Sequence, residues 1–194
     1  GIGDRCLGMS RQNIVILLLF LVSLGIWRWF DSSASDDADA RNAIFQPNYT
    51  TRDLVTRRYD ASGHLKEELH ASYAEHYAPL EMTELDNPEV RLTDAAGKGT
   101  WHILAKQGVI NQDDNALLRD RVQIISLDPQ SVVQKISTDY LEMDLGSQQV
   151  RTNLKVEMEG DGFHNQGVGF TGQLEQKIYQ LLDKSHAIYF NQPH

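Results

Sequence analysis

Cysteine is almost absent from this chain, since Cys6 is the single example among 194 residues. A lone cysteine cannot form a disulfide within its own chain, so the residues that follow must be stabilised by packing and by strand pairing. No apolar stretch precedes Cys6, which argues against a lipid-modified cysteine.

Positive charge is also scarce. The 18 lysines and arginines are outnumbered by 27 aspartates and glutamates, which leaves a formal net charge of −9. Such an acidic chain is not expected to bind nucleic acid.

Catalytic and metal-binding motifs are lacking as well. The sequence contains no GxSxG motif, no Walker phosphate loop and no defensible pair of carboxylates. His64, His70 and His76 recur at even spacing, with His102 further on, but a six-residue step covers about 20 Å of strand. We therefore expect no enzyme activity, no cofactor and no metal site, and keep a membrane-tethered hydrolase as an alternative.

Long apolar runs are absent after residue 30, which singles out the run from Ile14 to Phe30. A bilayer is crossed by roughly 17–25 residues of helix, and Arg28 can extend its charge to the headgroups. Arg5 and Arg11 precede the run and acidic residues follow it. The positive-inside rule then places the N-terminus in the cytoplasm and the rest outside it.

A cleavable signal peptide is the alternative interpretation of this run. Its apolar core would span about 7–15 residues and end before small residues, and Ser32, Ser33, Ala34 and Ser35 offer such a site. An uncleaved membrane helix fits the length of the run better.

These observations divide the chain into four segments. Residues 1–8 are expected to be additional to a natural chain that starts at Met9. The expected segments are a cytoplasmic N-terminus (1–13), a transmembrane helix (14–30), a flexible, acidic periplasmic linker (31–47) and one folded domain (48–191).

From Tyr49 onward, apolar and polar residues alternate with a period of two. The clearest runs are Leu65–Tyr73, Trp101–Ala105, Leu141–Leu145 and Val150–Met158, separated by turn sequences rich in Gly, Asn and Asp. No sustained helical period follows the linker. The pattern predicts an all-β domain of antiparallel strands.

A weak internal repeat runs through the domain. The segments that begin at Gly108, Tyr140 and Gly172 each read as a short strand, a polar turn and a longer strand. The spacing of about 32 residues is typical of stacked β units, whose end strands are left open to other chains.

Two segments resemble the OstA/LptA/LptC-like β-jellyroll family: TWHILAKQGVINQDDNALLRDRVQI and ISTDYLEMDLGSQQVRTNLKVEMEGDGFHNQGVGF. The N-terminal anchor, YDASGHL before the first alternating strand, and LDKSHAIYF near the end make the chain similar to LptC proteins over essentially Met9 to Phe190. The resemblance implies an antiparallel, V-shaped, open-edged β-jellyroll in the periplasm, behind a single helix in the inner membrane.

The same resemblance implies a function and partners. An LptC protein is expected to act with LptF, LptG and an LptB ATPase dimer. It would accept lipopolysaccharide from the jellyroll of LptF in an apolar groove and pass it to LptA. A membrane-tethered scaffold that holds envelope proteins without carrying lipid is the runner-up.

Twelve residues are expected to line the apolar groove, where acyl chains would be shielded from water. Each is also a candidate for an ordinary core position. They are Leu54, Leu69, Tyr73, Leu85, Trp101, Ile103, Leu141, Met143, Leu154, Val156, Val168 and Phe170.

Two glycines and two strands complete the expected site. Gly63 and Gly160 match turn glycines of the family, and a side chain at Gly160 would block the close approach of another backbone. The apolar strand Ala187, Ile188, Tyr189 and Phe190 is expected to pair with LptA.

The segment Tyr49–Tyr59 is expected to lie near LptF. Its Arg52, Arg57 and Arg58 are candidates for contact with lipid phosphates, with solvated surface charge as the alternative.

Overall fold

The computed structural model describes residues 15–16, 18–24, 26, 46–182 and 187–191, the last five by their backbone alone. It divides the chain into two units, Gly1–Gln46 and Pro47–His194. In the described part of the chain, no helix has the length and apolar character needed to cross a membrane. Much of the expected membrane helix, and the expected linker up to residue 45, lie outside the described residues.

Apart from Gln46, the described residues of the first unit are helical and almost all apolar. Residues 15–16, 18–24 and 26 are in helical conformation. All but Ser23 carry large apolar side chains that are exposed: Val15, Ile16, Leu18, Leu19, Phe20, Leu21, Val22, Leu24 and Ile26.

The second unit is built from strands, as the alternation predicted. One short 3-10 turn, Ala78–Leu80, interrupts them. The strands are β1 (Tyr49–Tyr59), β2 (Leu65–Tyr77), β3 (Met82–Asp86), β4 (Glu89–Thr93), β5 (Gly99–Leu104), β6 (Gln107–Asn111), β7 (Asn115–Ser126), β8 (Val133–Asp144), β9 (Gln149–Gly160), β10 (Phe163–Gln173), β11 (Ile178–Leu182) and β12 (Ala187–Asn191).

All twelve strands form one sheet with β1 and β12 at its ends. Long β2 pairs on one side with β1, and on the other with β4 along its first half and β3 along its second. The two short branches, β4–β5 and β3–β6, rejoin on β7. From β7 to β12 each strand pairs with the next, and every pairing is antiparallel. The all-β, antiparallel prediction is confirmed, and the arrangement is consistent with a jellyroll.

The strands are irregular near their middles, along a line that we call the crease. β7 has Asp120 and Arg121 at positive φ, 62° and 54°, and its register with β8 shifts between Arg119 and Val122. Gly169 in β10 has φ 83°, and the register of β10 with β9 shifts there as well. Such bulges bend strands and increase their twist, so they let one continuous sheet curl over its own apolar face.

The internal repeat corresponds to hairpins. β6–β7, β8–β9 and β10–β11 are the three segments that the sequence singled out. The pattern of buried and exposed residues along β7 is the same, position by position, as that along β9. The long second strands of the first two hairpins therefore repeat one pattern of inward and outward positions.

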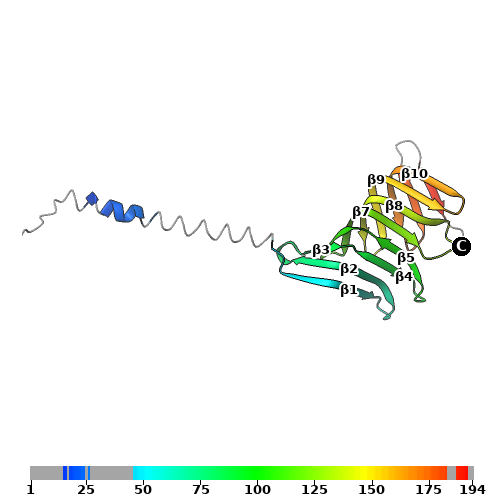
Figure 1. Ribbon diagram of the computed structural model, residues 1–194, viewed down its shortest axis with the longest axis horizontal. Helices are drawn as coiled ribbons and strands as arrows, with labels where there is room; N and C mark the ends of the chain where they lie inside the picture. The colour runs from blue at the N-terminus through cyan, green and yellow to red at the C-terminus, as the bar shows by residue number, and fades with distance from the viewer. Residues whose placement is uncertain (1–14, 17, 25, 27–45, 183–186, 192–194) are drawn as a thin grey trace, which may run out of the picture. The chain divides into compact units, whose positions relative to one another are not determined.

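Curling brings strands that are distant in the sheet order into contact. The indole nitrogen of Trp101 on β5 donates a hydrogen bond of 3.1 Å to the carbonyl of Leu174, in the β10–β11 turn. The Trp101 and Tyr179 rings meet edge to face at 6.0 Å between centroids, and Lys177 pairs with Asp128 of the β7–β8 loop at 3.2 Å. In Figure 1 the cyan and green strands lie along one side of this domain and the yellow and orange strands along the other.

Candidate functional site

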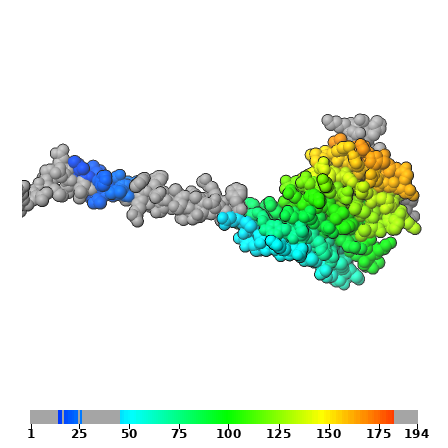
Figure 2. All heavy atoms as spheres, viewed as in Figure 1, coloured from blue at the N-terminus to red at the C-terminus, as the bar shows by residue number. Residues whose placement is uncertain are grey.

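The interior of the curled sheet is apolar and excludes solvent. Its largest fully buried side chains include Trp101, Phe170, Leu92, Ile103 and Leu141. They belong to β4, β5, β8 and β10, so both halves of the sheet contribute to one cluster. On the face shown in Figure 2 the side chains run without a break from cyan β1 to the orange strands.

The structure places nine of the twelve predicted groove residues in or against this interior. Eight are at most 5% exposed: Leu69, Leu85, Trp101, Ile103, Leu141, Met143, Val156 and Phe170. Leu54 is half-buried and packs against the cluster. Contact of these residues with lipid stays a prediction.

Tyr73, Leu154 and Val168 do not face the interior, contrary to the sequence prediction. Leu154 and Val168 are 42% and 52% exposed. The Tyr73 hydroxyl donates to Glu75, two residues on and therefore on the same face, while intervening Ala74 is buried. All three lie near the middle of their strands, at the crease. In β2 and β10 the inward positions change parity there. In β9 the parity is kept, and Leu154 alone turns outward between buried Thr152 and Val156.

Several interior residues were missed by the sequence analysis. Leu92, Ile124, Ile136 and Met158 are fully buried, and their apolar character at alternate positions was a usable signal. Tyr179 is buried too, on a strand too short to show a clear period.

A carboxylate was also missed. Glu67 is only 5% exposed and lies on β2 between half-buried Leu65 and buried Leu69, on the face that turns inward. The register places it opposite Leu92, and Leu92 opposite Trp101. Its Oε2 atom has no hydrogen-bond partner among the described residues.

The groups around Glu67 shift the pKa of its carboxyl in opposite directions. Burial raises the pKa of the Glu67 carboxyl above its ordinary value. The positive charge of Arg58 lowers this pKa, the negative charge of Asp114 raises it, and Lys66 lowers it less. Arg58 and Asp114 are themselves an ion pair of 2.7 Å between the end of β1 and the β6–β7 turn.

Tyr179 carries a second buried polar atom without a partner. Its side chain is packed against Trp101 and stacks on Phe170 at 6.4 Å between ring centroids. The hydroxyl has no hydrogen-bond partner in the described part of the chain. Burial raises the pKa of this phenol.

The two predicted glycines are required for different structural reasons, a positive φ at Gly63 and a lack of space at Gly160. Gly63 has φ 83° in the β1–β2 turn, where its N–H donates to the carbonyl of Asp60. At Gly160 an added Cβ would lie 2.0 Å from the carbonyl oxygen of Val132 and 2.2 Å from the Phe163 ring. The close approach at Gly160 is therefore already made by its own chain.

Comparison with known proteins agrees with this arrangement. The family described as "Lipopolysaccharide-assembly, LptC-related" matches residues 14–190. The chain belongs to the LptC family. It is 26% identical to the lipopolysaccharide export system protein LptC of Escherichia coli K12 over 178 residues, which cover 91% of each chain. It is 22% identical to LptC of Haemophilus influenzae over 199 residues, 92% of this chain and 94% of that protein.

The ends of this LptC-family sheet are the predicted partner strands. In the sheet order β12, which contains Ala187, Ile188, Tyr189 and Phe190, follows β11 and ends the sheet; their side chains lie outside the described residues. β1 lies at the other end. Two of its three arginines are engaged, Arg57 with Glu68 and Arg58 with Asp114.

The predicted histidines are dispersed over this LptC-family domain. His64 lies 3.4 Å from Asp60, His70 lies 2.7 Å from Glu68, and His102 lies 3.4 Å from Glu89. In the part of the chain that the structure describes, no three potential metal ligands are grouped.

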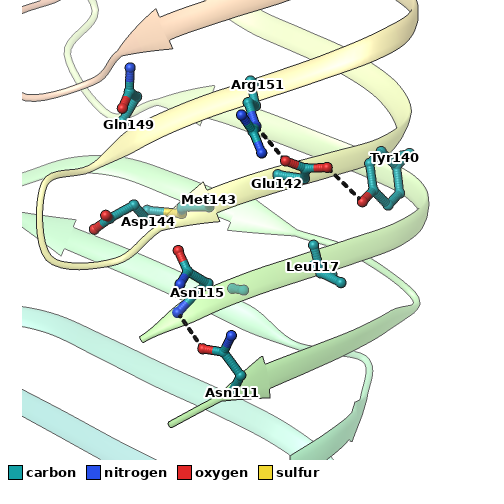
Figure 3. Close-up of a pocket in the computed structure, with 10 residues that line it drawn as sticks. Asn111, Asn115, Leu117, Tyr140, Glu142, Met143, Asp144, Gln149 and Arg151 are labelled. Carbon is teal, nitrogen blue, oxygen red and sulfur yellow. Dashed lines mark hydrogen bonds and ion pairs between the residues drawn. The ribbon is translucent and has the colours of Figure 1, made fainter. Parts of the chain in front are cut away.

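A pocket of about 570 Å³ opens on the outer face of β7, β8 and β9 in the LptC-family domain (Figure 3). Glu142 accepts hydrogen bonds from Arg151 and from the Tyr140 hydroxyl. The bond from Arg151, and then that from Tyr140, holds the pKa of Glu142 below its ordinary value. Because these polar groups satisfy one another, the pocket offers less to a ligand than the interior does.

Proposed function

We propose that this chain transports lipopolysaccharide, holding the acyl chains in the interior of the curled sheet. The observation that carries the proposal is the continuous apolar cluster contributed by both halves of a sheet that ends in two different strands. Membership of the LptC family, whose relatives are named as lipopolysaccharide export system proteins, supports it. Acyl chains gain about 25 cal/mol for each Å² of apolar surface removed from water.

The proposed location is the inner membrane, with a single pass and the folded domain in the periplasm. Nine exposed apolar side chains among the helical residues 15–16, 18–24 and 26 support an anchor here, because large exposed apolar surfaces mark membrane or protein contacts. In this proposal the anchor packs beside LptF and LptG, whose LptB ATPase dimer supplies the energy.

The direction of transfer in the proposal follows the sheet. Lipid enters from the jellyroll of LptF beside β1 and leaves toward LptA beside β12. End strands present unpaired backbone groups, so each can pair with a strand of another jellyroll.

A scaffold that carries no lipid is the second candidate. The observation that favours it is the tightness of the interior, where Trp101, Ile103 and Phe170 are at most 1% exposed. A lipid carrier with this interior must open to load, whereas a scaffold need not.

Photo-crosslinking in intact cells separates the two candidates. A photoreactive amino acid is placed at Phe170 and at half-buried Leu54. Exposed Leu154, and Glu68, whose side chain pairs with Arg57 on the outer face, are the controls. We expect lipopolysaccharide adducts at Phe170 and Leu54, none at the controls, and loss of adducts when the ATPase is disabled. Absence of lipid at both interior sites in a folded protein would leave the scaffold.

A further inference from the structure

We propose that Glu67 and the Tyr179 hydroxyl are two polar contact points, on opposite halves of the apolar interior, for hydroxyl groups on the acyl chains of the bound lipid. The inference rests on the proposed function and deepens it. In this proposal most interior side chains shield the acyl chains from water, and two recognise polar groups on those chains.

The position of Glu67 supports this role. Its cross-strand neighbours are Arg58 on β1 and Leu92 on β4. The Arg58 guanidinium is paired with Asp114 at 2.7 Å and Leu92 is an alkyl side chain, so the Oε2 atom receives no hydrogen bond from the described residues. Adjacent Glu68, which points outward, accepts hydrogen bonds from Arg57 and contacts His70 at 2.7 Å. The carboxylate on the outer face is satisfied, and the one on the inner face is not.

Tyr179 has the same property on the opposite half of the sheet. Its ring is fixed by Trp101 and Phe170, and its side chain is 3% exposed. The hydroxyl can donate one hydrogen bond and accept others, yet none is made within the described residues. Buried polar groups of this kind are uncommon in folded proteins and call for an explanation.

The chemistry of the two groups defines the ligand. Pure hydrocarbon would leave both groups without a hydrogen-bond partner. An ester carbonyl accepts but cannot donate. A hydroxyl does both, so it can satisfy Glu67 whether that carboxyl is ionised or neutral, and it can accept from Tyr179.

The ligand class that fits is therefore a lipid whose acyl chains carry hydroxyl groups. An ordinary diacyl phospholipid offers only ester carbonyls near its chains. The two groups would thus favour the hydroxyacyl lipid at loading, because a phospholipid without hydroxyl groups on its chains leaves both buried polar groups unpaired.

The test measures binding to the full-length chain in detergent. The probes are a synthetic lipid A with hydroxyacyl chains and its analogue lacking only those hydroxyls. The wild type is expected to prefer the hydroxylated probe by roughly three- to tenfold, the value of one or two hydrogen bonds. The variants Glu67→Leu and Tyr179→Phe should each bind both probes with a reduced preference, and Glu67→Gln should keep the preference of the wild type.

A stability measurement keeps the result interpretable. Glu67→Leu should unfold at a higher temperature than the wild type, because it removes a buried polar group without a partner. Preference unchanged in folded Glu67→Leu and Tyr179→Phe would overturn the inference and leave lipid transport intact. Failure of the wild type to bind either probe would overturn the proposed function as well.

Discussion

Among single residues, those at which the fold tolerates an unfavourable local situation are the most informative. Glu67 is a carboxyl held in an apolar interior, and Gly160 is a backbone position where the carbonyl of Val132 leaves no room for a side chain. Both positions lie on long strands whose other residues follow simple alternation. Each therefore allows a prediction that depends on one side chain.

The stability of the domain should depend on the protonation of Glu67. Burial raises the folded-state pKa above the ordinary value of 4.5, so the folded form holds the proton more tightly than the unfolded form. The stability penalty is then absent below the unfolded pKa, grows as pH rises through the folded pKa, and is complete above it. Glu67→Gln, which mimics the neutral acid, should exceed the wild type by about 1–3 kcal/mol at pH 8.

Denaturant unfolding of both proteins between pH 4 and pH 8 checks this expectation. The two free energies of unfolding should converge toward pH 4. A constant difference across the range would show that Glu67 does not titrate between those limits.

Substitution of Gly160 should be costly for steric reasons alone. An alanine Cβ would lie 2.0 Å from the Val132 carbonyl oxygen, so the start of β8 must move. We expect Gly160→Ala to lower the free energy of unfolding by about 1–3 kcal/mol. Gly146→Ala, where the nearest atom is the Asp144 carboxylate at 3.3 Å, is the matched control. Equal thermal stability of the two variants would contradict the steric explanation.

Among the elements, the crease is the feature that shapes the domain. Strand after strand changes its backbone geometry there, at Asp120 and Arg121 in β7 and at Gly169 in β10. The buried face therefore passes from Gly167 to Phe170 in β10 without keeping a two-residue period. Sheet curvature arises from these local irregularities.

The crease also marks how far sequence reasoning reaches. Alternation predicted the strands and the buried faces of Leu69, Ile103 and Met143, because a two-residue period is a local property. It failed for Val168, because the bulge at Gly169 shifts the phase of β10. It failed for Leu154, because this one side chain turns outward while Thr152 and Val156, of the same parity, stay buried. The inward position of Glu67 could have been predicted, since its parity matches that of Leu65 and Leu69. The branching of the sheet at β2 and β7 could not, because it depends on pairing between strands that are distant in the sequence.

Restricting the backbone at the crease should loosen the strands beside it. Gly169 has φ 83°, and an added Cβ would lie 3.0 Å from both Cβ and the carbonyl oxygen of Leu182. Gly169→Ala should cost about 1–2 kcal/mol and raise amide hydrogen exchange in β10 and β11 more than in β1 and β2. Uniform exchange across the domain would indicate global destabilisation without a local role for the crease.

For the folded domain as a whole, closure of the interior is the central property. The Trp101–Leu174 hydrogen bond and the Asp128–Lys177 ion pair join the two halves of the sheet at one end. In the proposed function, lipid reaches the interior when contacts of this kind separate. Loading should therefore be slowed when the halves are tied together.

A cleavable crosslink tests this expectation. In a Cys6→Ser background, cysteines replacing Asp128 and Lys177 are joined by a disulfide-containing bis-maleimide. We expect lipid adducts at Phe170 to fall at least tenfold and to return after reduction. Cysteines at Glu157 and Gln166, which face each other on adjacent β9 and β10, are the control within one half. Full loading of the crosslinked Asp128–Lys177 protein would show that the interior fills by another route.

The matching burial patterns of β7 and β9 have a consequence for design. Because β7 and β9 repeat the same inward and outward positions, a further hairpin with this pattern could be inserted between β9 and β10. The domain is in this sense modular, because its length can be varied by whole hairpins while the cross-section of its apolar interior stays the same. A lengthened version would be a direct route to a longer engineered conduit.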